Sequence, residues 1–167
     1  MPQTPSRARS LHVASSGQDV SLLPPEMIDA GHARAQVVYG SDASVIIASR
    51  DAGYHSKPHR HSSEQINYLL TGEAWVFIEE DGYLMKAGDL LRIPGNKVHW
   101  AWVKGDMSVS VVEVHTPPLT ADYEAGRVSL LLTDEEEARV EHTSNQWVQD
   151  FDWSAVERRV VGSCYEG

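Results

Sequence analysis

Short apolar runs alternate with turn-forming residues through the middle of the chain. The runs are rich in β-branched and aromatic residues and are bounded by pairs such as Thr71-Gly72 and Ala87-Gly88. The pair Asp81-Gly82, which stands between two apolar runs, predicts a hairpin. The pattern as a whole predicts strands at residues 37–39, 45–48, 66–70, 74–78, 83–86, 90–93, 99–103 and 108–114. Many short strands at this spacing favour an all-β antiparallel barrel of the jelly-roll kind.

The two ends of the chain differ from this central part. The N-terminal segment carries short apolar stretches interrupted by Pro24 and Pro25, which suits an edge strand packed on one end of the barrel. At the other end, Pro117-Pro118 closes the series of strands. We therefore interpret the chain as one domain with an N-terminal extension (1–35), a barrel (36–118) and an acidic, partly helical tail (119–167).

Within the tail, two features predict structure. Thr133 and Asp134, followed by glutamates at 135–137, predict a short helix that runs to about His142, because a capping side chain and acidic groups both favour a helix start. Further on, Trp147, Phe151 and Trp153 supply apolar area that should pack against another apolar surface. The sequence leaves open whether they pack on their own barrel or on a second subunit.

Charge and cysteine content narrow the possible partners. The formal net charge of the 167 residues is −10, which argues against nucleic acid because phosphate binding requires clustered Lys and Arg. Residues 113–167 hold four basic and twelve acidic side chains, whereas residues 53–104 hold six of each. The chain has a single cysteine, Cys164, and no apolar stretch of about eighteen residues. We expect a cytoplasmic protein with no membrane partner.

Three histidines indicate a metal site. His59 and His61 are two residues apart, so on a strand their side chains project from the same face, roughly 6.6 Å apart, and His99 follows near a later strand. Imidazole is the commonest protein ligand for divalent transition metals. A fourth ligand could come from Glu64 or Gln65, which point to opposite faces of a strand. We favour Gln65 because it shares parity with the two histidines.

These residues belong to two spaced motifs. The first consists of Gly53, five residues, His59, one residue, His61, three residues, Gln65, six residues and Gly72. The second consists of Gly88, five residues, Pro94, one residue, Asn96, two residues and His99. Together they resemble the motifs of the cupin family over about residues 53–118. In two places the chain departs from the family pattern: Gln65 stands where the family usually has a Glu ligand, and Asn96 stands where it has a glycine.

Both departures are compatible with the resemblance. Asn tolerates left-handed backbone angles, so Asn96 can serve a turn that is normally built with glycine. The motif His-x-His-x-x-Glu-Gln is similar to that of a subgroup of small single-domain cupins in which the amide oxygen of the Gln binds the metal. The resemblance therefore implies a double-stranded β-helix barrel, one divalent metal on His59, His61, Gln65 and His99, and a homodimer.

The expected site suggests the kind of chemistry. Four neutral donors leave the full charge on a bound Zn, Ni, Mn, Fe or Co ion, so the site should attract a small, anionic or enolisable substrate. Open coordination positions are typical of catalytic metal sites. A proton carrier would also be needed, and strand positions favour four candidates. These are Tyr68, His55, Glu113 and His115.

Three functions remain open on the sequence alone. The resemblance includes lyases and isomerases that act on uronates, dioxygenases, and proteins with no assigned reaction. The leading hypothesis is a metal-dependent lyase or isomerase acting on a small oxygenated or carboxylated molecule, uronate-like or a keto acid. The alternatives are an Fe(II)-dependent dioxygenase and a non-catalytic cupin that binds or senses a small molecule. An enzyme should place a proton carrier in the pocket beside the metal ligands.

Overall fold

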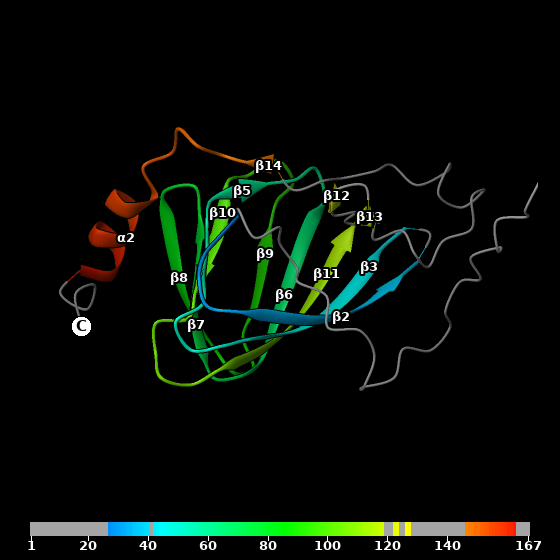
Figure 1. Cartoon of the computed structure of the whole chain (residues 1–167), viewed down its shortest axis with the longest axis horizontal. Coiled ribbons are helices and arrows are strands. Elements are labelled where there is room, and N and C mark those ends of the chain that lie inside the picture. Colours follow the sequence, from blue (N-terminus) through cyan, green and yellow to red (C-terminus); the bar gives the residue numbers. More distant parts are fainter. Residues whose placement is uncertain (1–26, 41, 119–121, 124–125, 128–145, 163–167) are drawn as a thin grey trace, which may run out of the picture.

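Two antiparallel sheets make up most of the fold (Figure 1). The computed structural model describes residues 27–40, 42–118, 122–123, 126–127 and 146–162. The seven-stranded sheet contains β1 (Ile28–Ala30), β4 (His55–Ser56), β5 (His59–Arg60), β7 (Glu73–Ile78), β8 (Asp81–Lys86), β10 (His99–Trp102) and β14 (Gln146–Trp147). The five-stranded sheet contains β2 (Ala33–Tyr39), β3 (Ser44–Arg50), β6 (Glu64–Thr71), β9 (Leu90–Ile93) and β11 (Val109–Thr116). Strands β12 (Asp122–Tyr123) and β13 (Gly126–Arg127) pair with each other, and the α-helix α2 (Trp153–Val161) lies later in the chain.

Strand order in the sheets confirms the expected all-β jelly roll. The five-stranded sheet runs β2-β3-β11-β6-β9, and the seven-stranded sheet runs β1-β4-β10-β5-β14, with β7 joining β10 to β8. Neighbours in the sheets are therefore often distant in sequence, as when β11 lies between β3 and β6. This order brings both histidine motifs to one sheet, because β10 pairs with β5.

Side-chain alternation in the five-stranded sheet builds the inner wall of the barrel. Along β11, Val109, Val111, Glu113 and His115 are buried, whereas the residues between them are partly exposed. Strands β3 and β6 alternate in the same way. The apolar half of the inner face joins the facing sheet in one core, which includes Ile46, Leu69, Val76, Ile93 and Val111. The polar half of that face is left for the site.

The hairpin between β7 and β8 exists, but its turn lies two residues before the predicted pair. Ile78 pairs with Asp81, so Glu79 and Glu80 form the loop and Asp81-Gly82 belongs to β8. Glu79 has a φ of 55°, a conformation that Gly or Asn usually supplies. Gly82 is instead required by packing, because a Cβ there would lie 2.5 Å from Cγ1 of Val160.

Helix α2 closes one side of the barrel beside β8 (Figure 1). Asp152 is its N-cap and accepts a hydrogen bond from the backbone N–H of Ala155 at 3.1 Å. Its buried face packs with Phe151 and Trp153 against Phe77 and Trp100. These two tail aromatics therefore pack on their own barrel. The helix predicted from residue 133 to about His142 lies outside the described residues, as does Cys164.

The outer face of the five-stranded sheet is apolar and exposed. One cross-strand row runs Ile47, Val112, Tyr68 and Leu90, and the next runs Val45, Val114, Ile66 and Arg92. Leu90 is 70% exposed and Ile47 is 46% exposed. Apart from Arg92, these two rows carry no charge. In the part of the chain that the structure describes, no helix is long and apolar enough to cross a membrane.

Candidate metal centre

Two loops bring the three histidines together. His59 on β5 is the register partner of His99 on β10, and His61 follows β5. The loop before His99 docks on the segment after His61, where the backbone N–H of Asn96 donates to the His61 carbonyl at 2.7 Å. Asn96 has a φ of 64°, which confirms its expected left-handed conformation. A Cβ at Gly95 would lie 2.3 Å from the carbonyl oxygen of Ser62, so only glycine permits this approach.

The three imidazoles form a compact cluster, with one ligand nitrogen from each within 4.8 Å of the others. Each ring uses Nδ1 to donate to a backbone carbonyl two residues away. His59 donates to Lys57 at 2.9 Å, His61 to Ser63 at 3.0 Å and His99 to Lys97 at 2.9 Å. A hydrogen bond at Nδ1 fixes the tautomer in which Nε2 carries the free lone pair. All three rings therefore offer Nε2 as a ligand atom.

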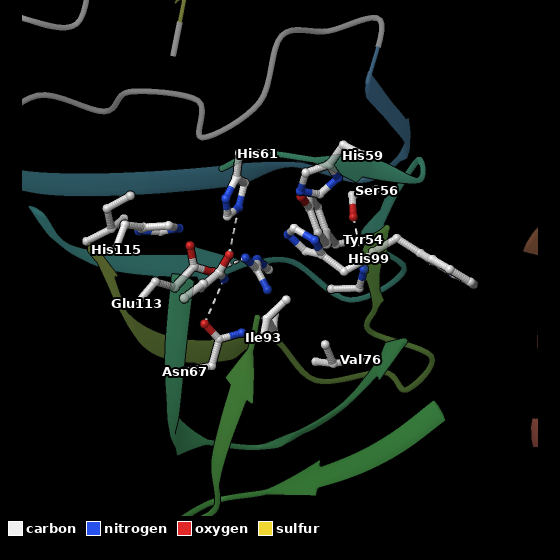
Figure 2. Close-up of a pocket in the computed structure, with 15 residues that line it drawn as sticks. Tyr54, Ser56, His59, His61, Asn67, Val76, Ile93, His99, Glu113 and His115 are labelled. Carbon is white, nitrogen blue, oxygen red and sulfur yellow. Dashed lines mark hydrogen bonds and ion pairs between the residues drawn. The ribbon is translucent and has the colours of Figure 1, made fainter. Parts of the chain in front are cut away.

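Gln65 completes the cluster with its amide oxygen. Its Nε2 donates to Oδ1 of Asn67 at 2.7 Å, which turns Oε1 toward His61, 3.1 Å from the imidazole Nε2 (Figure 2). The neighbouring Glu64 lies on the other face of β6, where its carboxylate accepts from Nε of Arg92 at 2.7 Å. Of the two alternatives for a fourth ligand, the geometry thus favours Gln65.

The donor set fits a cation. Because Nδ1 of His61 donates to the carbonyl of Ser63, Nε2 of the same ring carries a lone pair and no proton. This lone pair faces a lone pair on Oε1 of Gln65, and the two atoms are 3.1 Å apart. A shared positive charge relieves this contact, and ligands about 2.1 Å from a metal at right angles lie roughly 3 Å apart. In addition, Nε2 of His99 is buried and has no hydrogen-bond partner within the described structure. These observations are what a metal-binding cluster requires.

Burial keeps the histidines neutral. It lowers the pKa of His59 to about 3, although the bond to Lys57 opposes the shift. Burial likewise lowers the pKa of His61 and holds that of His99 well below its usual range, where the neighbouring His59 and His61 add to the effect. Neutral imidazole is the form that binds metal. The ligands are therefore ready for a metal at neutral pH.

A pocket opens beside the cluster (Figure 2). Its empty volume, including the open mouth, is ≈ 440 Å³, which suits a small molecule. Its apolar wall includes Ile46, Val76 and Ile93, and its polar wall includes Arg50, Tyr54, Ser56, Asn67, Glu113 and His115. Arg50 and Glu113 form an ion pair inside the pocket. The pocket thus combines neutral metal ligands with one internally balanced pair of charges.

The structure brings two of the four predicted proton carriers to this pocket. Glu113 and His115 both line it and lie on the side opposite His59 and His99 (Figure 2). The ring of His115 is 5.3 Å from that of His61, centroid to centroid, and burial holds its pKa well below the usual range. His115 is therefore a neutral base close to the cluster.

Tyr68 and His55 lie elsewhere. Tyr68 is 40% exposed on the outer face of the five-stranded sheet. Nε2 of His55 lies 2.7 Å from a carboxylate oxygen of Glu157 on α2. Its ring is 5.9 Å from that of Trp102 and 4.9 Å from that of Trp153, centroid to centroid. Neither residue lines the pocket, because strand alternation sends Tyr68 outward and sends His55 toward α2. We therefore do not retain either as a proton carrier.

Four polar residues of the pocket were not identified from the sequence: Arg50, Tyr54, Ser56 and Asn67. Arg50 lies outside the two motifs, and the other three occupy positions that the first motif leaves unspecified. Asn67 offered one usable signal, since it shares parity with Gln65 on β6. Arg50 required knowledge of the strand order, because its partner Glu113 is 63 residues away in sequence.

Comparison with known proteins agrees with this geometry. Residues 47–115 match the family model described as a cupin domain. They form a cupin domain. No curated protein matches the chain. The match covers β4 to β10 and most of β3 and β11, and it includes the four metal-ligand candidates.

Solved cupin structures are similar in fold. A cupin-like protein from Thermotoga maritima superposes with a TM-score of 0.59 at 15% identity, covering 90% of this chain and 100% of that chain. A cupin 2 conserved barrel domain protein from Rhodopseudomonas palustris gives 0.51 at 15% identity, covering 59% and 69%. KdgF from Halomonas sp. gives 0.48 at 23% identity, covering 51% and 78%. At 15% identity the first two similarities extend to the fold alone.

Proposed function

We propose that this protein is a metal-dependent enzyme that moves a proton on a small oxygenated molecule, as a lyase or an isomerase. The observation that carries the proposal is the presence of Glu113 and His115 in the pocket beside the four metal ligands. A protein that only binds a ligand has no need for buried proton carriers next to the metal. Buried titratable groups in a pocket favour catalysis, and burial holds the pKa of His115 well below its usual range.

The ligand set is His59, His61, His99 and the amide oxygen of Gln65. A divalent metal held there would polarise a carbonyl or hydroxyl oxygen of the substrate and make an adjacent proton more acidic. Because all four donors are neutral, the charge of the metal is not reduced by the protein. The neutral donor set is therefore suited to stabilising negative charge on a substrate oxygen.

His115 is suited to accept the substrate proton. It is 1% exposed, and its Nδ1 has no hydrogen-bond partner within the described structure. Because burial keeps its pKa well below the usual range, the ring is neutral at pH 7 and has a free lone pair. Glu113, two residues earlier on the same face of β11, is placed to hold or return a proton on the same side of the pocket. A base and a second proton carrier on one side fit elimination or isomerisation.

The test is turnover by metal-replete protein on a panel of keto acids, uronates and catechols, with dissolved O₂ monitored in parallel. In D₂O, the proposal predicts deuterium incorporation at the carbon next to the substrate carbonyl, with no O₂ consumption. His115→Gln should lower the rate by about 10²–10⁴-fold without metal loss. Tyr68→Phe, a change on the outer face, serves as the matched control and should leave the rate unchanged.

Two outcomes would contradict the proposal. Stoichiometric O₂ consumption with a catechol or keto acid would instead assign an Fe(II)-dependent dioxygenase. Tight ligand binding with no deuterium exchange and no product from any member of the panel would assign a protein that binds or senses its ligand.

A further inference from the structure

Arg50 is a buried cation inside the pocket. It is 8% exposed and comes from the end of β3, where its register partner on β11 is Val109. Glu113, with which it pairs, lies opposite Ile46, four residues before Arg50 on β3. The arginine side chain therefore extends along the inside of the barrel, and its guanidinium group reaches the polar half of the inner face.

The ion pair leaves part of the guanidinium group unused. Nη2 of Arg50 donates to Oε1 of Glu113, whereas Nε is buried and has no partner within the described structure. The group also lies over the ring of Tyr54, 5.2 Å from its centroid. A guanidinium group has five N–H donors in a planar fork and can bind two carboxylates at once. Burying it with an unused donor is unfavourable unless a ligand completes its hydrogen bonds.

The charge distribution of the pocket points to the ligand. Arg50 and Glu113 balance each other, and the four metal ligands are neutral, so a bound divalent ion leaves the pocket with two positive charges. Arg50 is close enough to His59 and His115 for its charge to lower the pKa of both. An anion would thus find the metal on one side and the guanidinium group on the other.

We propose that Arg50 is the anion anchor of this pocket and that the substrate is a small carboxylate with an oxygen on the neighbouring carbon. The carboxylate would accept hydrogen bonds from the free donors of Arg50, while the neighbouring oxo or hydroxyl oxygen faces His59, His61 and His99. This inference rests on the proposed metal-dependent reaction and names its substrate class. The opposing interpretation is that Arg50 only neutralises Glu113.

The two interpretations differ in whether changes at Arg50 and Glu113 alter the preference for a carboxylate. If Arg50 is the anchor, Glu113 competes with the incoming carboxylate for the same guanidinium group. Removing Arg50 then weakens carboxylate binding, and removing the charge of Glu113 strengthens it. If Arg50 only neutralises Glu113, neither change alters the preference for a carboxylate over a neutral group of the same shape.

The experiment compares pyruvate with pyruvamide, its neutral counterpart of the same size, by calorimetric titration of metal-loaded protein. The measured quantity is the ratio of the two affinities, which separates charge recognition from general damage to the pocket. Arg50→Gln should lower this ratio by about tenfold or more, the effect of losing a charge-assisted hydrogen bond. Arg50→Lys keeps the charge but not the fork, so it should retain part of the preference.

Glu113→Gln supplies an independent test if Arg50→Gln does not fold. It should raise the pyruvate-to-pyruvamide ratio by several-fold, because the guanidinium group is released. An unchanged ratio in the variants that fold, or no preference for pyruvate in the unmodified protein, would overturn the inference. Carboxylate binding that depends on Arg50 without turnover of any tested substrate would leave the anchor in place and refute the enzyme. Turnover of a tested substrate, with an affinity ratio that does not depend on Arg50, would support the enzyme and refute the anchor.

Discussion

Acid should destabilise the metal-free protein well above the pH at which carboxylates titrate. Burial lowers the pKa of His59 to about 3 in the folded state, whereas an unfolded histidine titrates near 6.5. The folded state therefore resists protonation that the unfolded state accepts. The contribution of His59 to stability is complete above pH 6.5, falls as the pH drops below that value, and changes no further below about pH 3.

The size of the effect follows from the shift. At pH 5 an unfolded histidine is protonated and a folded His59 is not, which costs about 2 kcal/mol of unfolding free energy. Burial also holds the pKa values of His99 and His115 well below the usual range, so both residues change stability in the same direction. The loss at His59 alone is a sizeable part of the 5–15 kcal/mol that holds a typical domain together. His59 alone should lower the melting temperature by roughly 4–8 °C.

The assay is thermal unfolding of chelator-treated protein, followed by circular dichroism at pH 7, 6 and 5. The melting temperature should fall steeply over this interval. His32→Asn changes an exposed histidine and should reproduce the same profile. Replacing both His59 and His99 with Asn should flatten the profile. A melting temperature that stays constant between pH 7 and pH 5 in the chelated protein would refute the reasoning.

Three further predictions concern packing and assembly. Gly82→Ala places a Cβ 2.5 Å from Cγ1 of Val160, so overpacking should cost about 1–3 kcal/mol in urea unfolding, and unchanged stability would contradict the contact. Glu157→Leu removes the carboxylate that accepts a hydrogen bond from Nε1 of Trp100 at 2.7 Å, and it should lower the unfolding free energy by about 1–3 kcal/mol in the same assay. An unchanged unfolding free energy would show that this buried hydrogen bond contributes little. We propose that the expected homodimer forms through the two apolar outer rows of the five-stranded sheet, in which Arg92 is the one charged residue. Ile47→Lys should then convert the dimer to a monomer in sedimentation velocity, and a monomeric unmodified protein would contradict it.

The sequence predicted the strands of the barrel well because period-two alternation and turn residues are local signals. Residues 90–93 were predicted as the structure has them, and most other strands differ by only a few residues at their ends. The turn between β7 and β8 was misplaced because Asp81-Gly82 was interpreted by turn preference. In the structure Gly82 is selected by its contact with Val160, which no local pattern reveals.

Helix α2 was not identified in advance. Asp152 is a valid capping residue, but the nine-residue helix contains three valines and is stabilised by tertiary burial of Val156 and Val161 against the barrel. A usable signal was Asp152 at the N-cap with Ser154 close behind it. A short helix of this kind depends on the barrel face it covers, and that face is assembled from strands distant in sequence.

In the candidate site too, local sequence signals identified some residues, and long-range strand pairing placed the others. Spaced motifs identified the histidine cluster, and parity on β6 favoured Gln65 over Glu64. The pairing of Arg50 with Glu113 and the outward direction of Tyr68 depend on strand order and register, which the sequence does not specify. Long-range geometry, more than residue type, decided which polar groups share the pocket.

The metal content of purified, reconstituted protein tests the central claim most directly. Elemental analysis after dialysis should find about one divalent transition metal per chain, and His61→Ala should abolish its retention. Glu64→Ala is the matched control, because its carboxylate pairs with Arg92 on the outer face, and it should leave the metal content unchanged. Absence of metal after reconstitution, or metal loss in Glu64→Ala but not in His61→Ala, would contradict the account.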